Sequence, residues 1–270
     1  MLVICDNDGV FGNFSKEVAP WDEDLGPHLE DLKRIREHVT NTGDTYSICT
    51  GRSLPSTRDI MRLTGINGPC MLEMGNLILS PGGDMYRLVD TPEYSHLRQS
   101  SDRLAEWGRY AAENEDNIFA SLIDSGLRLR YLKDREHIFT WEITGSNFTG
   151  YQLYDALNNG YLECIRGDLE SGRIAVLLSA KAIDFMPAIN KGDAVRHVMN
   201  EYGFKAENVA AVGDSGHSDI PMMEPAGYVA CPSNADDATL DYVRGRGGYV
   251  SDHSFADGTL DILRYIDERR

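Results

Sequence analysis

The segment LVICDNDGV, residues 2–10, decides the fold class of this chain of 270 residues. Its apolar run, Leu2–Cys5, has no polar alternation, which is typical of a strand that is buried on both faces of a parallel sheet. Similar runs occur at Tyr46–Cys49 and Val209–Val212, and polar or glycine-rich residues follow each of them. The runs therefore predict strands of one parallel sheet.

Helical patterns lie between and after these runs, because apolar residues recur there at the spacing of one helix face. We expect one helix that carries Leu29 to Val39, one over Pro55–Leu63, and one that begins after Lys191 and ends at Gly203. Two more are expected at Asp236–Val243 and Thr259–Ile266, together with a short strand at Tyr228–Cys231. A strand followed by a helix, repeated along the chain, predicts an α/β fold with a doubly wound parallel sheet.

The middle of the chain has a different pattern, in which short strand-like runs are separated by turns. The expected strands are Asn117–Leu122, Leu127–Leu132, His137–Ile143, Tyr161–Ile165 and Arg173–Ser179, and the expected helices are Ser95–Ala112 and Thr149–Leu157. This α+β pattern lies inside the α/β pattern. We therefore expect an inserted domain over residues 82–186, between two halves of a core at 1–81 and 187–270.

The charge of the chain excludes two classes of partner. With 26 basic and 43 acidic side chains the formal net charge is −17. Such a surface repels phosphate backbones and anionic lipids, so neither nucleic acid nor a membrane is expected as a partner. The cysteines are scattered without a C-x-x-C pair, which suits a reducing cytoplasm. An anionic substrate would need a local cation.

Two acidic side chains, Asp6 and Asp8, directly follow the first strand. Because side chains alternate along an extended chain, both project the same way, and two close carboxylates need a proton or a cation between them. With Mg²⁺ present, Asp6 can act as an ionised nucleophile and Asp8 can hold or release a proton. The alternative is a simple turn, since Asp and Gly also favour turns.

Further candidate residues follow the second strand and open the helix after the insert. The hydroxyl of Thr50, the backbone N–H of Gly51 and the guanidinium of Arg52 can bind phosphate oxygens, although a capped helix start would have the same sequence. Asn190 and Lys191 open the later helix. A lysine there opposes the helix dipole, which suggests a use other than helix stability.

The strand Val209–Val212 leads into Asp214 and Asp219. Asp214 is expected at the carboxyl edge of the sheet, where open α/β sheets bind ligands. With Asp6 and Asp8 it would supply the oxygen ligands that a hard cation such as Mg²⁺ prefers. Asp219 could instead cap the helix that follows.

These motifs, in this order, resemble those of the haloacid dehalogenase superfamily of phosphatases over nearly the whole chain. Asp6–Val10 resembles the first motif, Thr50 the hydroxyl of the second, Lys191 the lysine of the third, and Asp214 with Asp219 the acidic pair of the fourth. The insert resembles the cap of the subgroup that contains Cof-type, sucrose-phosphate, mannosyl-phosphoglycerate and archaeal phosphoglycolate phosphatases.

The resemblance implies a mechanism and a substrate class. Asp6 would attack phosphorus to give an aspartyl-phosphate, and Asp8 would protonate the leaving alcohol and then activate water. Thr50 and Lys191 would bind the phosphoryl oxygens. Mg²⁺ would lie among Asp6, the Asp8 backbone carbonyl and Asp214, with Asp219 in the outer shell or paired with Lys191. The substrate would be a small phosphorylated metabolite, such as a sugar phosphate or a phosphoglycolate-like acid.

Two other functions share the same residues. A phosphotransferase or phosphomutase would use the aspartyl-phosphate with an acceptor other than water. A non-catalytic metal-binding relative would keep the acidic cluster without turnover. The polar stretch between Val10 and His28 is expected beside the site, either as a flap or as a loop.

Overall fold

The structure is a computed structural model that describes residues 1–12, 28–144, 147–179 and 181–269. The chain divides into two compact units. The core unit comprises Met1–Tyr86 and Asn190–Arg270, and the inserted unit comprises Arg87–Ile189. The boundaries therefore fall a few residues after those expected at 82 and 186. Most of the stretch expected as a flap or loop, residues 13–27, lies outside the described residues.

A parallel sheet forms the centre of the core unit, with strand order β12-β11-β10-β1-β2. Its strands are β1 (Leu2–Cys5), β2 (Thr45–Ile48), β10 (Val209–Val212), β11 (Tyr228–Cys231) and β12 (Tyr249–Val250). All side chains of β1 and of β10 are buried, as their unbroken apolar sequences predict. The α/β fold class is thus confirmed.

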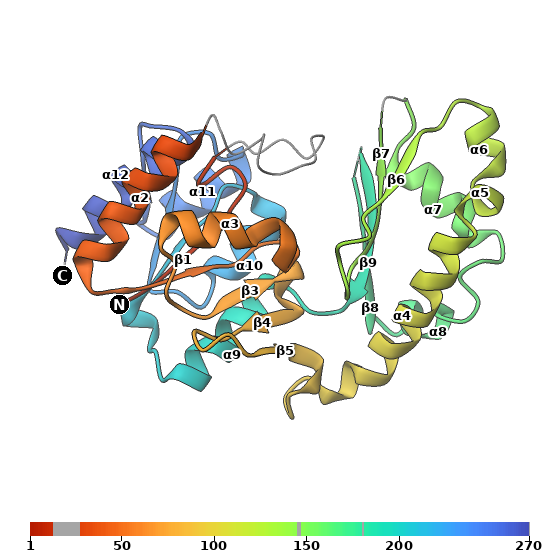
Figure 1. The fold of residues 1–270 in the computed structure, drawn as a ribbon, viewed down its shortest axis with the longest axis horizontal. Helices are drawn as coiled ribbons and strands as arrows, with labels where there is room; N and C mark the ends of the chain where they lie inside the picture. Colours follow the sequence, from red (N-terminus) through yellow and green to blue (C-terminus); the bar gives the residue numbers. More distant parts are fainter. Residues whose placement is uncertain (13–27, 145–146, 180, 270) are drawn as a thin grey trace. The chain divides into compact units, whose positions relative to one another are not determined.

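The helices of the core unit form two groups (Figure 1). They are α2 (Leu29–Thr42), α3 (Leu54–Thr64), α9 (Lys191–Tyr202), α10 (Gly216–Met223), α11 (Asp237–Gly245) and α12 (Phe255–Asp267). Helix α2 packs against α3 and α12, and α10 packs against α9 and α11. From β1 the chain moves to β2 in one direction, and from β10 to β11 in the other. Right-handed crossovers then place α2 and α10 on opposite faces, as in a doubly wound sheet.

A second, smaller sheet in the chain was not expected from the sequence. It consists of β3 (Cys70–Leu72), β4 (Leu77–Leu79) and β5 (Met85–Arg87), in that order. A backbone bridge joins Cys49, just after β2, to Met71 in β3. This bridge ties β3 to the carboxyl end of β2.

The inserted unit contains an antiparallel sheet of order β6-β7-β9-β8. Its strands are β6 (Leu129–Tyr131), β7 (Phe139–Ile143), β8 (Ile174–Leu178) and β9 (Ala182–Pro187), and its helices are α4 (Arg98–Glu113), α5 (Glu115–Ile118), α6 (Ala120–Asp124), α7 (Gly150–Asn158) and α8 (Arg166–Glu170). Alternate strand residues such as Trp141 and Phe185 join Leu104 of α4 and Leu153 of α7 in one buried cluster. The unit therefore has its own hydrophobic core.

Two of the strands predicted in the inserted unit are not strands in the structure. Residues 117–122 lie in helices α5 and α6 and in the turn at Phe119 between them, and residues 161–165 form turns that lead into α8. In both segments the buried apolar side chains, such as Ile118 and Phe119 or Leu162 and Ile165, pack against the cluster from short helical or turn backbone. Periodicity does not distinguish strand from helix in apolar runs this short.

None of the helices in the described part of the chain is both long enough and apolar enough to cross a membrane.

Candidate active site

The strand order reverses between β1 and β10, and this places the carboxylates of Asp6 and Asp214 side by side. Cys5, the last residue of β1, is paired with Val212, the last residue of β10. The backbone N–H of Asp6 continues this ladder by donating to the carbonyl of Val212 at 2.9 Å. Asp214 follows β10 by two residues. Ligands of open α/β sheets bind at such a reversal, outside the carboxyl ends of the strands.

Lys191 joins Asp6 to a third carboxylate. Its Nζ lies 2.8 Å from Oδ1 of Asp6 and 2.7 Å from Oδ1 of Asp219, which is in the first turn of α10. The lysine is 2% exposed and lies at the N-terminus of α9. Burial alone would lower the pKa of its ammonium group, but the charges of Asp219 and Asp6 outweigh burial and raise that pKa. Lys191 is therefore a permanently charged link between the two acids.

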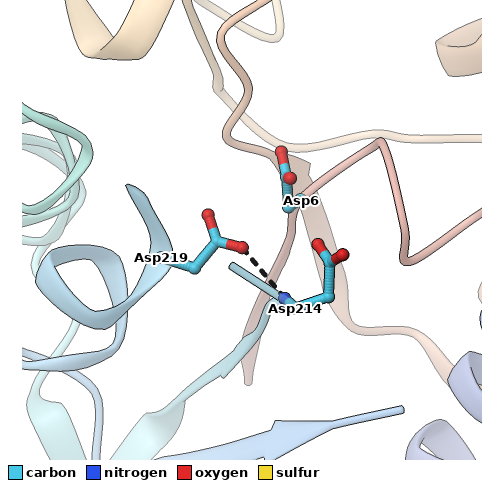
Figure 2. Close-up of side chains that lie close together, drawn as sticks. All are labelled: Asp6, Asp214 and Asp219. Carbon is cyan, nitrogen blue, oxygen red and sulfur yellow. Dashed lines mark hydrogen bonds between the residues drawn. The ribbon is translucent and has the colours of Figure 1, made fainter. Parts of the chain in front are cut away.

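Asp219 is held by the backbone of the loop that carries Asp214. Its Oδ2 accepts the N–H of Asp214 at 2.9 Å (Figure 2). The same oxygen accepts the N–H of Ser215 at 3.0 Å, and Oδ1 accepts the hydroxyl of Ser218 at 2.9 Å. Its side chain is fully buried. Both oxygens of Asp219 are thus engaged, so this residue orients Lys191 and the Asp214 loop.

Gly9 allows the loop after β1 to approach Asp214 closely. Its backbone lies in the left-handed region, at φ 76°, which favours glycine. A Cβ atom at this position would lie 1.9 Å from Oδ2 of Asp214. No side chain fits there unless the carboxylate moves.

The carboxylates of Asp6, Asp214 and Asp219 lie close enough together to bind one cation. One oxygen from each lies within 4.8 Å of the others. Three carboxylates and the single ammonium of Lys191 leave a formal charge of 1 − 3 = −2. Burial raises the pKa of Asp214 to about 7, with a further contribution from Asp219, and burial also raises that of Asp6. A buried excess of negative charge among oxygen donors suits a hard divalent cation.

The side chain of Asp8 contacts Arg52, while the metal contact that the resemblance implies for the backbone carbonyl of Asp8 stays a prediction. Its carboxylate accepts two hydrogen bonds from the guanidinium of Arg52, at 2.6 Å from Nε and 2.5 Å from Nη2. Arg52 is 5% exposed. The carboxylate of Asp8 is absent from the acidic cluster found among the described residues. The guanidinium of Arg52 therefore orients Asp8, and its expected contact with phosphate stays a prediction.

Thr50 and Gly51 lie in the loop after β2, and a strained turn supports that loop. Glu73 and Met74 have left-handed backbone, at φ 49° and φ 58°, and Gly75 follows at φ 95°. The N–H of Met74 donates to the carbonyl of Thr50 and the N–H of Glu73 to that of Arg52, both at 2.9 Å. Left-handed backbone in non-glycine residues costs about 1 kcal/mol or more each. This turn therefore braces the loop that the sequence predicts to bind phosphate.

Asn190 has a structural role at the start of α9. Its side-chain oxygen accepts the N–H groups of Gly192 at 2.8 Å and Asp193 at 3.1 Å, while Asp193 accepts the N–H of Asn190 in return. This capping box fixes the first helical turn and therefore the position of Lys191. The side-chain oxygen of Asn190 is thus engaged in capping, and its expected contact with phosphate stays a prediction.

Sequence reasoning missed the residues that hold the loop after β1 from the C-terminal part of the chain. Nδ2 of Asn234 donates to the carbonyl of Gly9 at 2.9 Å, and the hydroxyl of Thr259 donates to the carbonyl of Val10 at 2.7 Å. Both contacts join residues more than 220 positions apart. The sequence carries no local pattern that indicates them.

Comparison with known proteins identifies relatives in sequence. The family model of haloacid dehalogenase-like hydrolases matches residues 28–258. A phosphoglycolate phosphatase from Methanosarcina mazei is 33% identical over 217 residues, which are 77% of this chain and 87% of that protein. A phosphoglycolate phosphatase from Methanothrix thermoacetophila is 36% identical over 78 residues, so the match spans only 33% of its length.

Solved structures show the same fold. The sucrose-phosphatase from Synechocystis sp. PCC6803, in complex with sucrose and phosphate, matches with a TM-score of 0.61 at 18% identity. The match covers 99% of this chain and 98% of that protein. Together with the family model, which spans most of the sequence, these similarities show that the chain belongs to the haloacid dehalogenase-like hydrolases.

Proposed function

We propose that this hydrolase is a Mg²⁺-dependent phosphomonoesterase that acts through an aspartyl-phosphate on Asp6. The observation that carries this proposal is the placement of Asp6. Its carboxylate lies at the reversal of strand order, is held by Lys191 at 2.8 Å, and has Asp214 beside it. Phosphoryl transfer depends mainly on such positioning and on neutralisation of charge.

The reaction assigns one task to each of the charged residues. An oxygen of Asp6 attacks phosphorus, the bond from phosphorus to the leaving oxygen breaks, and Asp8 supplies the proton that the leaving alcohol takes. Water then attacks the aspartyl-phosphate while Asp8 accepts a proton from it, which releases phosphate and restores Asp6. The hydrogen bonds from Arg52 keep Asp8 in one orientation through both steps.

The phosphoryl oxygens need cationic and hydroxyl partners. Lys191 and the hydroxyl of Thr50 would bind them, with the N–H of Gly51 as a further donor. Asp6 and Asp214 would hold the Mg²⁺ ion, with the backbone carbonyl of Asp8, and Asp219 would orient the Asp214 loop. When bound, the ion neutralises charge on the transferring phosphoryl group.

The substrate class we propose is a small phosphorylated metabolite, either a phosphoglycolate-like acid or a sugar phosphate. The name of the Methanosarcina mazei relative, which this chain matches over 87% of its length, supports phosphoglycolate. The name of the Synechocystis protein supports a sugar phosphate. We assign selection among these substrates to the inserted unit, because it has its own core and can vary while the site residues stay in place.

Hydrolysis of p-nitrophenyl phosphate tests the proposal. We expect Mg²⁺-dependent release of nitrophenol, and Asp6→Asn should lower kcat by more than about a thousandfold because it removes the nucleophile. Asp59→Asn, an acidic surface residue of α3, is the control and should keep full activity. A fully active Asp6→Asn variant would exclude the aspartyl-phosphate. A screen of phosphoglycolate and sucrose phosphate then decides the substrate.

A further inference from the structure

A second site in the core unit lies at the opposite edge of the parallel sheet. A cavity of about 180 Å³ is lined there by Met1, which precedes β1, by Tyr228 and Tyr249, which begin β11 and β12, and by residues within the strands such as Ala211. Each residue of a strand advances about 3.3 Å, so Asp214 lies roughly 10 Å further along the chain than Ala211. None of the residues that line this cavity belongs to the cluster of Asp6, Asp214 and Asp219 in the candidate active site.

The cavity carries positive charge in a strongly acidic protein. Arg246 and Arg269 line it, and neither guanidinium has a carboxylate partner within the described ranges. Arg246 is oriented by its hydrogen bonds to the hydroxyl of Tyr242 at 2.7 Å and to the carbonyl of Ala226 at 2.9 Å. With a net charge of −17, such a pair of uncompensated arginines at one cavity indicates an anionic ligand.

Aromatic rings form the other part of the cavity wall. Tyr249 and Tyr265 stack with their centroids 3.9 Å apart, and the guanidinium of Arg269 lies 4.3 Å from the centroid of the Tyr265 ring. Tyr228 also lines the cavity and is 40% exposed. Rings of this kind bind flat apolar groups well because they bury area at a small cost in conformational entropy.

We propose that this cavity binds a small aromatic carboxylate, with the ring against the tyrosines and the carboxylate at the arginines. The volume limits the ligand, since a cavity of about 150 Å³ accommodates benzene. The 180 Å³ found here fits one ring with its anionic group. A guanidinium binds a carboxylate through two parallel hydrogen bonds, which gives the ligand one orientation.

Calorimetric titration of the full chain with benzoate tests the site. We expect saturable binding with a Kd of about 1 mM or lower. Benzamide, which has the ring without the charge, and acetate, which has the charge without the ring, should each bind at least about tenfold more weakly. The titration needs no divalent cation, so the candidate active site need not be loaded.

Matched variants distinguish binding in this cavity from a general effect of removing a positive charge or a surface tyrosine. The double variant Arg246→Gln with Arg269→Gln should weaken benzoate binding by more than about tenfold, whereas Arg264→Gln, on α12 but outside the cavity lining, should not. Tyr228→Ala should also weaken binding. Tyr202→Ala is its control, because Tyr202 is 38% exposed and does not line the cavity.

The proposal is overturned if benzoate shows no saturable binding, binds no better than benzamide, or binds equally well to the double arginine variant. Hydrolysis of p-nitrophenyl phosphate, measured on the same samples, keeps the two proposals apart. The arginine and tyrosine variants should hydrolyse it normally. Absence of hydrolysis in the unmodified chain would contradict the proposed function and leave the binding result valid.

Discussion

At the scale of single residues, the pair formed by Arg52 and Asp8 makes a sharp prediction. Arg52→Lys keeps the positive charge but loses the planar fork that donates two hydrogen bonds to Asp8. Because Asp8 would then sample other orientations, kcat should fall by about tenfold, the cost of one lost charge-assisted hydrogen bond. Steady-state hydrolysis of p-nitrophenyl phosphate measures the change.

Arg58→Lys is the matched control for that variant, because Arg58 is exposed on the neighbouring helix α3. Its kcat should equal that of the unmodified chain. A rise in KM with unchanged kcat for Arg52→Lys would instead show that Arg52 binds the substrate phosphate and does not orient Asp8.

The sequence was a good guide to some site residues and a poor guide to others. Asp6 and Asp214 follow strands that pair in register, so their meeting at one edge follows from sheet topology. The engagement of Asp219 and the capping role of Asn190 do not follow from topology, because they depend on the local path of two loops. The bridge from Arg52 to Asp8 depends on a side-chain rotamer, which no motif specifies.

At the scale of elements, helix α12 supports the loop that carries Asp6 and Asp8. The hydroxyl of Thr259, which is fully buried, donates to the carbonyl of Val10. Thr259→Val keeps the shape but leaves that carbonyl buried without its donor, so the free energy of unfolding should fall by about 2 kcal/mol. Urea unfolding at neutral pH, followed by circular dichroism, measures this loss.

Thr259→Ser separates the hydrogen bond from packing, since it keeps the hydroxyl and removes a methyl group. Its loss in unfolding free energy should be smaller, about 1 kcal/mol. If the serine variant loses as much as the valine variant, packing and not the hydrogen bond is what Thr259 contributes.

Helices and strands were predictable where their apolar pattern was long or where both faces of a strand are buried. The strands buried on both faces, β1 and β10, and the amphipathic helices α2 and α9 follow the sequence closely. The short helices and strands do not follow the sequence pattern in this way. Strand β9 went unpredicted because Ala182–Pro187 mixes Asp184 into an apolar run, and the small β3-β4-β5 sheet has strands of only 3 residues each.

At the scale of the whole molecule, the inserted unit is stabilised by a buried carboxylate with several charged and polar partners. Asp168 is 3% exposed and accepts hydrogen bonds from Arg103 at 2.8 and 2.7 Å, from Arg173 at 3.0 Å and from the hydroxyl of Ser100 at 2.9 Å. These partners, led by Arg103, lower the pKa of Asp168 to about 2. The residue ties α4 and α8 to the chain just before β8.

Asp168→Asn should therefore destabilise the inserted unit in a pH-dependent way. The pKa of Asp168 is lower in the folded than in the unfolded chain, so its contribution is complete above about pH 5 and is lost as the pH falls towards 2. At pH 7 the variant should lose about 2 kcal/mol of unfolding free energy, and about half of that difference should remain at pH 3.

Urea unfolding followed by tryptophan fluorescence measures this difference, because Trp107 and Trp141 lie in the core of the inserted unit. Asp155→Asn, an exposed residue of α7, should unfold like the unmodified chain at every pH. A loss for Asp168→Asn that stays constant from pH 7 to pH 3 would show that its carboxylate charge is not the source of stability.

The burial of Lys191 has a practical consequence for the whole molecule. Amine-reactive esters attack only neutral, accessible amines, and Lys191 is enclosed and held in its charged form by two carboxylates. Lys33, Lys133, Lys181 and Lys205 are all exposed. The protein can therefore be coupled to a support or a fluorophore through its surface amines while the lysine that the catalytic proposal depends on stays chemically untouched.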